Sequence, residues 1–247
     1  MLSFLKQHPF AMEAFFQSSM VLGFAFPKEQ LADLVPECLE LDVFDDKWAF
    51  VAVAMVQTKN MRPKGFPKLL GRDFFLMGYR IFVRYKTSSG RKLRGLYILK
   101  SDTDSFLMKV AGNLMTDYHY HFIDATVSEK SGCITVDAPS AGFAVSLQKG
   151  EDHFDLPLHS PFADWKEARR FAGPMPFTFT YKEKKKEVLM IEGVRNHWKP
   201  KPVKVHRYAI PYLESLGTGG AVLANAFIVE NVPYYWEKGI IDPWKPV

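Results

Sequence analysis

The pattern of hydrophobic and polar residues predicts a chain built mainly of β-strands. Apolar, β-rich runs pair off twice in the first half: residues 39–58 are expected to form a hairpin around Asp45-Asp46, and residues 74–102 a second hairpin. The second is joined by the polar turn 87–92, which holds a glycine where the backbone needs a positive φ. Further strand-like runs fill most of the second half: 117–139, 142–149, 176–194, 203–210 and 221–236.

Three short stretches show helical spacing instead of alternation. The first follows Pro27 and ends before Pro36, the second has Asp102 or Asp104 as its candidate cap, and the third ends at Gly173. Many antiparallel strands with a few short helices predict a β-rich α+β fold, either a barrel or a curled sheet around a cavity.

Composition narrows the class of protein. The chain has 247 residues with 47% hydrophobic and 15% aromatic content, so residues 1–247 are expected to form a single domain around one large core. No window approaches the roughly 18 uninterrupted apolar residues of a membrane span, so no membrane partner is expected. His8 and Pro9 break the apolar start, which argues against secretion. Only Cys38 and Cys133 are present, and this favours a reducing cytoplasm.

The charge balance argues against a nucleic-acid partner. The net charge of +5 is the small excess of 32 basic over 27 acidic residues, and no dense basic helix occurs. The densest basic windows, 59–68 and 197–207, are both broken by prolines. They are interpreted as solvated loops and an edge strand, with the basic rim of a pocket for a small acid as the alternative.

Alternation also organises a candidate site in the stretch GNLMTDYHYHF. In an extended strand, Tyr118 and Tyr120 point to one face and the histidines beside them to the other. A phenol offers a flat apolar surface with a donor at its tip, which suits a small carbonyl or carboxylate compound. Asn113, Thr116 and Arg80 are candidate polar anchors, because an arginine can hold a carboxylate bidentately. The alternative is that both tyrosines are core aromatics.

The opposite face carries Asp117, His119 and His121, which permit a metal site. His-x-His places two imidazoles side by side, with a carboxylate two residues earlier as third ligand or orienter. Without a distant ligand at a telling spacing, we expect no metal and no cofactor, and treat the metal site as an alternative. His121 is also kept as a candidate substrate contact.

Lys100 is the candidate nucleophile for imine chemistry. Leu96, Ile98 and Lys100 are expected on one face of a strand, so the lysine would emerge from an apolar row that favours the neutral amine. The ordinary interpretation is that Lys100 lies at the strand end and pairs with Asp102 or Asp104.

The segment LADLVPECLELDVFDDKWAFVAVAMV resembles the opening of the acetoacetate decarboxylase-like superfamily, in which a short helix ends in a VP-x-x-LE-x-D turn. The closer resemblance is to the YqjF-like DUF2071 family. It is carried by the loop RPKGFPKLLGRDFF, the strand GYRIFVRY with Arg80, and the strand GLYILKSDTD, and is clearest over residues 20–125. The resemblance implies an antiparallel β-barrel or cone with a central cavity and a few short helices.

For activity, the resemblance implies a departure from true decarboxylases. In those enzymes a helix resembling VAGNLM leads into a strand with adjacent lysines, one of which forms a Schiff base with the keto acid. Here that pair falls on Tyr120 and His121, and the usual substrate arginine falls near Ala25. Neither Tyr120 nor His121 can form an imine.

We therefore expect a pocket for a small organic acid or ketone, without classical acetoacetate decarboxylation. If the protein is an enzyme, lyase or hydratase chemistry on a small carbonyl acid is expected, with Tyr120 as general acid or base and Arg80 as carboxylate anchor. A metal-assisted enzyme and a non-catalytic interaction module are the alternatives. Association into a homo-oligomer is left open, because related barrels associate.

Overall fold

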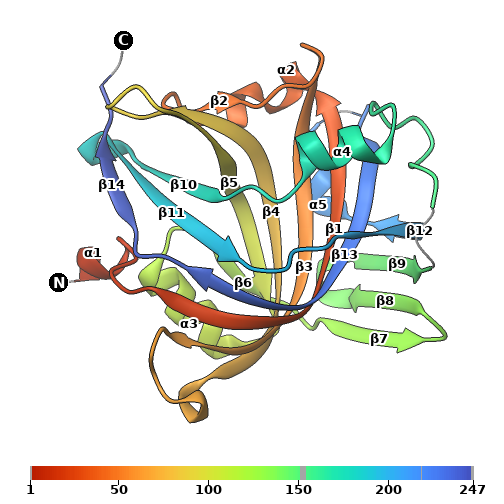
Figure 1. Cartoon of the computed structure of the whole chain (residues 1–247), viewed down its shortest axis with the longest axis horizontal. Coiled ribbons are helices and arrows are strands. Elements are labelled where there is room, and N and C mark those ends of the chain that lie inside the picture. Colours follow the sequence, from red (N-terminus) through yellow and green to blue (C-terminus); the bar gives the residue numbers. More distant parts are fainter. Residues whose placement is uncertain (1, 151–153, 218, 246–247) are drawn as a thin grey trace.

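A computed structural model describes residues 2–150, 154–217 and 219–245 (Figure 1). The helices are α1 (Leu2–Leu5), α2 (Lys28–Leu31), α3 (Phe106–Met115), α4 (Trp165–Ala172) and α5 (Pro211–Glu214). The strands are β1 (Met12–Pro27), β2 (Glu40–Leu41), β3 (Trp48–Pro63), β4 (Arg72–Lys86), β5 (Lys92–Thr103), β6 (Tyr120–Phe122), β7 (Thr126–Lys130), β8 (Cys133–Ala138), β9 (Phe143–Lys149), β10 (Phe177–Lys182), β11 (Glu187–Arg195), β12 (Lys201–Ala209), β13 (Val222–Trp236) and β14 (Ile240–Pro243).

The strands form one continuous sheet that turns back on itself. Its order is β14-β11-β10-β5-β4-β3-β1-β13-β12-β9-β8-β7, and β11 also pairs with β13 through Gly193–Arg195 and Tyr234–Trp236. That pairing makes a closed circuit of β11, β10, β5, β4, β3, β1 and β13, from which β12, β9, β8 and β7 extend to one side (Figure 1). The described pairings are antiparallel, apart from those of β5 with β6 and with β10. The predicted β-rich α+β class is confirmed.

Alternate residues of the long strands face two different regions: the large hydrophobic core on one side of the sheet and the inside of the closed circuit on the other. On β3, Val51, Val53 and Met55 belong to the large core that the β7–β8–β9 side covers. Ala52 and Ala54, which point the other way, face the inside of the circuit. Because the inward residues at this point are small, they leave space inside the circuit that larger side chains would fill.

The predicted hairpin around Asp45-Asp46 is wrong. The segment before the turn forms only a single bridge, Phe44 to Trp48, and the short β2 pairs with β4 instead. Both sides of β3 are already occupied by β1 and β4, so β2 finds no free edge there.

The predicted hairpin of residues 74–102 and the three predicted helices are confirmed. The β4–β5 hairpin turns at Gly90, whose φ is +84°, as the turn chemistry requires. The three predicted helices correspond to α2, α3 and α4. The predicted cap of α3 is wrong: Ser105 caps it by accepting a hydrogen bond from the Met108 amide, because Asp102 lies within β5 and Asp104 accepts from Phe75.

Among the described residues, no helix has the length and apolar character needed to cross a membrane.

Candidate functional site in the central cavity

The closed circuit surrounds a cavity of about 310 Å³. Each strand of the circuit contributes lining residues, and α3 and the segment after α4 complete the walls. The described lining residues include arginines and tyrosines but no lysine and no carboxylate. A cavity with cationic groups and no acid favours an anionic ligand.

Arg80 places a positive charge inside this cavity. It extends from β4 over Gly78, where an added Cβ would lie 2.9 Å from Arg80 Nε, so the glycine leaves room for the guanidinium. Its Nε atom is buried and has no hydrogen-bond partner among the described residues. Burial lowers the pKa of Arg80, opposed by Tyr234, Tyr120 and Tyr118, which face the same charge.

Tyr120 approaches the cation from β6. The residue is 7% exposed, and its ring lies against Gly112 of α3, where an added Cβ would be 2.4 Å from the ring carbon Cδ2. Burial raises the pKa of Tyr120 to about 12, although the Arg80 charge lowers it. The phenol therefore keeps its proton at neutral pH and is a hydrogen-bond donor there.

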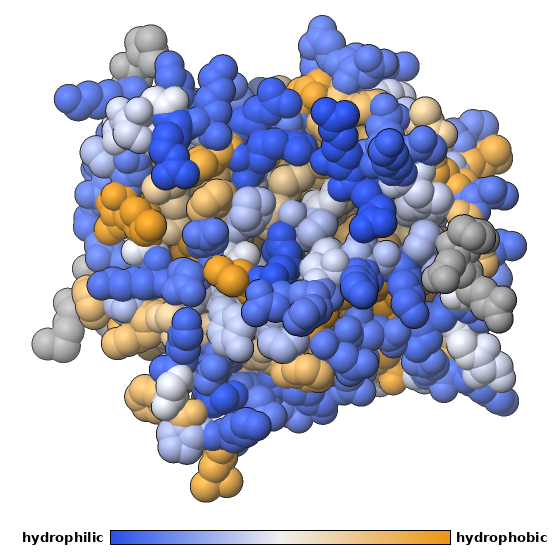
Figure 2. Space-filling view, in the orientation of Figure 1, coloured by the Kyte–Doolittle hydropathy of each residue, from blue (hydrophilic) through white to orange (hydrophobic). Residues whose placement is uncertain are grey.

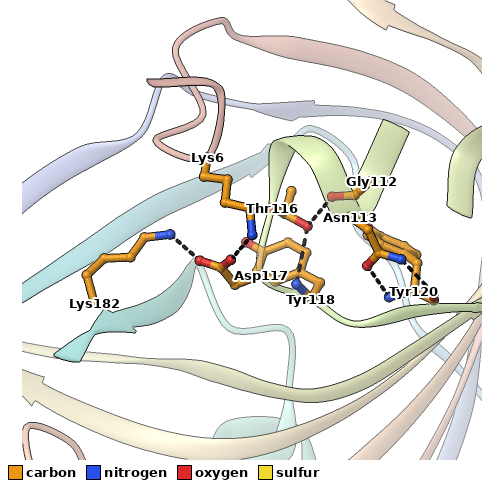
Figure 3. A network of polar contacts seen from close by, with 8 residues as sticks. All are labelled: Lys6, Gly112, Asn113, Thr116, Asp117, Tyr118, Tyr120 and Lys182. Atoms are coloured by element: carbon orange, nitrogen blue, oxygen red, sulfur yellow. Dashed lines mark hydrogen bonds and ion pairs between the residues drawn. The ribbon is translucent and has the colours of Figure 1, made fainter. Parts of the chain in front are cut away.

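Asn113 and Thr116 hold the tyrosine segment in place (Figure 3). Asn113 donates to the Tyr120 carbonyl and accepts from the Tyr120 amide, both at 2.8 Å. Thr116 donates to the Gly112 carbonyl at 2.8 Å and accepts from the Tyr118 amide at 3.3 Å. Thr116 also lines the cavity, whereas Asn113 does not and its amide is engaged with backbone.

Tyr118 completes the phenol pair. Its ring centroid lies 6.4 Å from that of Tyr120, and both residues line the cavity. Burial and the neighbouring Tyr120 raise the pKa of Tyr118. The hydrogen bond with Thr180 and the Arg80 charge lower the pKa, but by less, so the net shift is upward. The structure thus brings Tyr118, Tyr120 and Arg80 together around one space.

The alternative metal ligands do not converge. Asp117 is held by Lys6 at 2.6 Å and by Lys182 (Figure 3), while His119 adopts a φ of +52° and is exposed. Burial raises the pKa of Asp117, but the hydrogen bonds from Lys182 and Lys6 lower it by more and hold it below its usual range. The expectation that Asp117 shares a strand face with the histidines is wrong, because β6 begins only at Tyr120. No group of three candidate ligands occurs in the described ranges.

A β-bulge places Lys100 on the far side of the wall. Arg80 pairs with Ile98, yet the residue before Arg80 pairs with Lys100, so one residue of β5 is left over. The prediction that Leu96, Ile98 and Lys100 share one face is therefore wrong. Lys100 instead lies 3.0 Å from Asp102, as its ordinary interpretation expects.

Asp102 is the centre of a second charged group, on the face away from the cavity. Its side chain is fully buried, and His121, which is exposed, lies 3.7 Å away. Burial raises the pKa of Asp102, although the Lys100 and His121 charges lower it. The Lys100 ammonium also lies over the rings of Tyr79 and Tyr212, at 5.6 and 5.3 Å.

Tyr234 is a cavity residue that the sequence reasoning missed. Its hydroxyl lies directly over Gly193, where an added Cβ would be 2.0 Å away, and its ring stacks on Phe16 at 4.5 Å. Gly193 and Tyr234 belong to the β11–β13 pairing that closes the circuit. The signal was the alternation of Val232, Tyr234 and Trp236 at the end of a long strand, which puts all three on one face.

Comparison with known proteins supports the resemblance to the DUF2071 family in sequence and to acetoacetate decarboxylases in fold. The DUF2071 family model, described as "Uncharacterized conserved protein", matches residues 14–233. No curated protein matches the chain.

Several solved structures share the fold. Acetoacetate decarboxylase from Legionella pneumophila subsp. pneumophila str. Philadelphia 1 is 11% identical with a TM-score of 0.60, covering 93% of this chain and 86% of that one. A second acetoacetate decarboxylase structure is 12% identical with a TM-score of 0.56, covering 94% and 88%. The enduracididine biosynthesis enzyme MppR, complexed with pyruvate, is 10% identical with a TM-score of 0.50, covering 94% and 90%. At these identities the likeness shows a common fold.

Proposed function

The chain belongs to the DUF2071 family, and from this premise we propose that it holds a small organic acid in the central cavity, with the carboxylate on Arg80. The observation that carries the proposal is the buried Arg80 Nε without a partner in the described part of the chain. Burying an unpaired charge costs several kcal/mol, on the order of the penalty for each ion of a buried pair. A carboxylate would accept from two guanidinium nitrogens at once and offset that cost.

The neighbouring phenols extend the proposal to catalysis. A carbonyl next to the bound carboxylate would lie within reach of Tyr120, whose proton stays in place because its pKa is about 12. Donation from Tyr120 would polarise the carbonyl while a hydroxide or water molecule of the solvent takes the α-proton, and the phenol would stabilise the enolate that results. Enolate formation is the step common to lyase and hydratase reactions of carbonyl acids. Imine formation has no support, since none of the described lining residues is a lysine. The similar structure of MppR contains pyruvate, which makes pyruvate a suitable probe.

Calorimetric titration with pyruvate tests the binding proposal. Arg80→Met should weaken pyruvate binding at least tenfold, because a charged hydrogen-bonding partner is worth about 1.5–3 kcal/mol. Lys86→Met is the matched control: it removes an exposed cation from the same strand and should leave affinity unchanged. The proposal is wrong if no short carboxylate binds, or if Arg80→Met binds pyruvate as the wild type does.

Proton exchange tests the catalytic extension. A site that stabilises the enolate should speed exchange of the pyruvate methyl protons in deuterated water, followed by nuclear magnetic resonance. Tyr120→Phe should slow that exchange by roughly a factor of 100, the usual lower contribution of a general acid. Exchange no faster than with the buffer alone would leave a binding protein without this chemistry.

A further inference from the structure

The cavity is larger and more apolar than its charged end requires. Its volume of about 310 Å³ reaches the lower end of the ~300–1,000 Å³ that holds a drug-sized ligand. Apart from the arginines and tyrosines, the walls are formed largely by aliphatic, methionine and phenylalanine side chains, among them Leu76, Phe82, Leu96, Ile98 and Met175. A two- or three-carbon acid would leave most of this surface without contacts.

The remaining cations of the wall do not add a second anion subsite. Arg62 is 2.7 Å from Glu13, which neutralises it. Arg195 lies over the Trp198 ring at 5.1 Å and donates to a backbone carbonyl. The fourth arginine of the wall, Arg72, is exposed to solvent at the start of β4. Among the described lining arginines, Arg80 is thus the one with a buried guanidinium nitrogen that has no partner, and it calls for one buried carboxylate rather than two.

The apolar wall continues to the surface. Leu70 and Leu107 both line the cavity, and they are 54% and 57% exposed. Next to them, Phe66, Leu69 and Phe106 are more than half exposed. Figure 2 shows hydrophobic side chains at the lower edge of the molecule, where Figure 1 has the connection between β3 and β4. The exposed lining residues at this end are therefore largely apolar, with Arg72 as a solvent-exposed cation beside them, whereas the Arg80 Nε atom is buried inside.

Resting on the proposed function, we infer that the natural ligand is an amphipathic monocarboxylate, with an alkyl or aryl body of about six to ten carbon atoms. The carboxylate binds Arg80, and the body lies along the apolar wall toward Leu107. A ligand of this class covers the apolar surface from the cation to the opening. Its apolar body also lowers the cost of passing an opening made of leucines and phenylalanines.

Chain length gives a quantitative test by calorimetry with the full-length protein. In the series from butyrate to octanoate, each added methylene should raise affinity about threefold to fourfold, the value for burial of one such group. Octanoate should bind at least 10 times more tightly than pyruvate and than octanol, which has the same body without the charge. Arg80→Met should weaken octanoate binding at least tenfold.

Variants of exposed leucines test the path of the body without disturbing the fold. Leu107→Gln should weaken octanoate about threefold or more and leave pyruvate unchanged. Leu158→Gln is the control, because Leu158 is 82% exposed and lies outside this cavity.

The outcomes separate this inference from the proposed function. Pyruvate binding that depends on Arg80, with no gain from added methylenes, overturns the ligand class and leaves the proposed function standing. Suberate binding more tightly than octanoate overturns the single-carboxylate assignment. If octanol binds as tightly as octanoate, both to the wild type and to Arg80→Met, then the ligand class and the role of Arg80 are both overturned.

Discussion

The β4–β5 wall carries a buried charge on each of its faces, and the two have opposite surroundings. On the inner face, the Arg80 Nε atom is buried without a hydrogen-bond partner among the described residues. On the outer face, Asp102 is fully buried and has Lys100 at 3.0 Å and His121 at 3.7 Å. The bulge in β5 separates the two arrangements, because it turns Lys100 away from the cavity and leaves Arg80 beside Ile98.

The difference distinguishes a charge that stabilises the fold from one that is available to a ligand. The interior cost of Asp102 is offset in part by the Lys100 ammonium at 3.0 Å, although neither carboxylate oxygen accepts a hydrogen bond from the described residues. The cost of Arg80 is not offset in this way, and the side chain faces a cavity. If this distinction is right, removing the cation on the two faces must have opposite effects on stability.

The largest effect is expected on the outer face. Lys100→Met leaves a fully buried carboxylate without its nearest cation and should lower the free energy of unfolding by about 3 kcal/mol at neutral pH. The loss should shrink on acidification, since the pKa of Asp102 is raised and the protonated acid needs no cation. Urea unfolding measures it, with Lys92→Met, an exposed cation of the same strand, as the control. A loss within the range of the control would mean that the pair contributes nothing to stability.

On the inner face the sign should reverse. Arg80→Met removes a partly exposed cation whose Nε atom is buried without a hydrogen-bond partner among the described residues, and it should raise the free energy of unfolding by about 1–2 kcal/mol in ligand-free protein. A saturating carboxylate should stabilise the wild type by mass action and leave the variant unchanged. Thermal unfolding with and without the acid measures both. A ligand-free variant less stable than wild type would show that Arg80 contributes to the fold and would remove the contrast.

Local signals explain how much of the fold followed from the sequence. Gly90 at its turn, Pro27 before α2 and helical spacing in α3 each act within a few residues, and these elements were predicted correctly. The pairing of β2 with β4 and the closure of β11 on β13 depend on which strand edges remain free. That information is not local, so alternation alone does not contain it.

In the candidate site, too, some residues could be identified from the sequence and others could not. Alternation and the resemblance brought Tyr118, Tyr120 and Arg80 to attention, and the structure places all three around one cavity; their roles with a ligand stay predictions. Asp117 was assigned to a metal alternative, but its partner Lys6 is 111 residues away in the chain. The bulge that redirects Lys100 leaves no distinctive residue in the sequence, so the face of that lysine was not predictable from period-two counting.

A smaller effect should appear in the pH dependence of the outer group. An acid whose pKa is raised on folding binds its proton more tightly in the folded state, so its contribution to stability increases as pH falls through that pKa toward 3.8. Asp102→Asn lacks this proton. Relative to that variant, the wild type should gain stability between neutral and mildly acidic pH. Urea unfolding across this range measures the difference, and a constant difference would show that Asp102 has no raised pKa.

The smallest effect concerns the coupling between Arg80 and Tyr120. With a pKa of about 12, Tyr120 should be only about one-tenth ionised at pH 11, whereas a phenol of ordinary pKa would be about nine-tenths ionised. Because folding raises this pKa above its usual 10.0, the contribution of Tyr120 to stability decreases as pH rises from 10 toward 12. Arg80→Met removes the charge that lowers the pKa, so ionisation at pH 11 should fall further. Carbon-13 resonances of the tyrosine rings measure it, with Tyr120→Phe as the assignment control. Ionisation that is unchanged in Arg80→Met would place the guanidinium away from the phenol, and the cavity would then lack the pair of groups that the chemistry of a carbonyl acid requires.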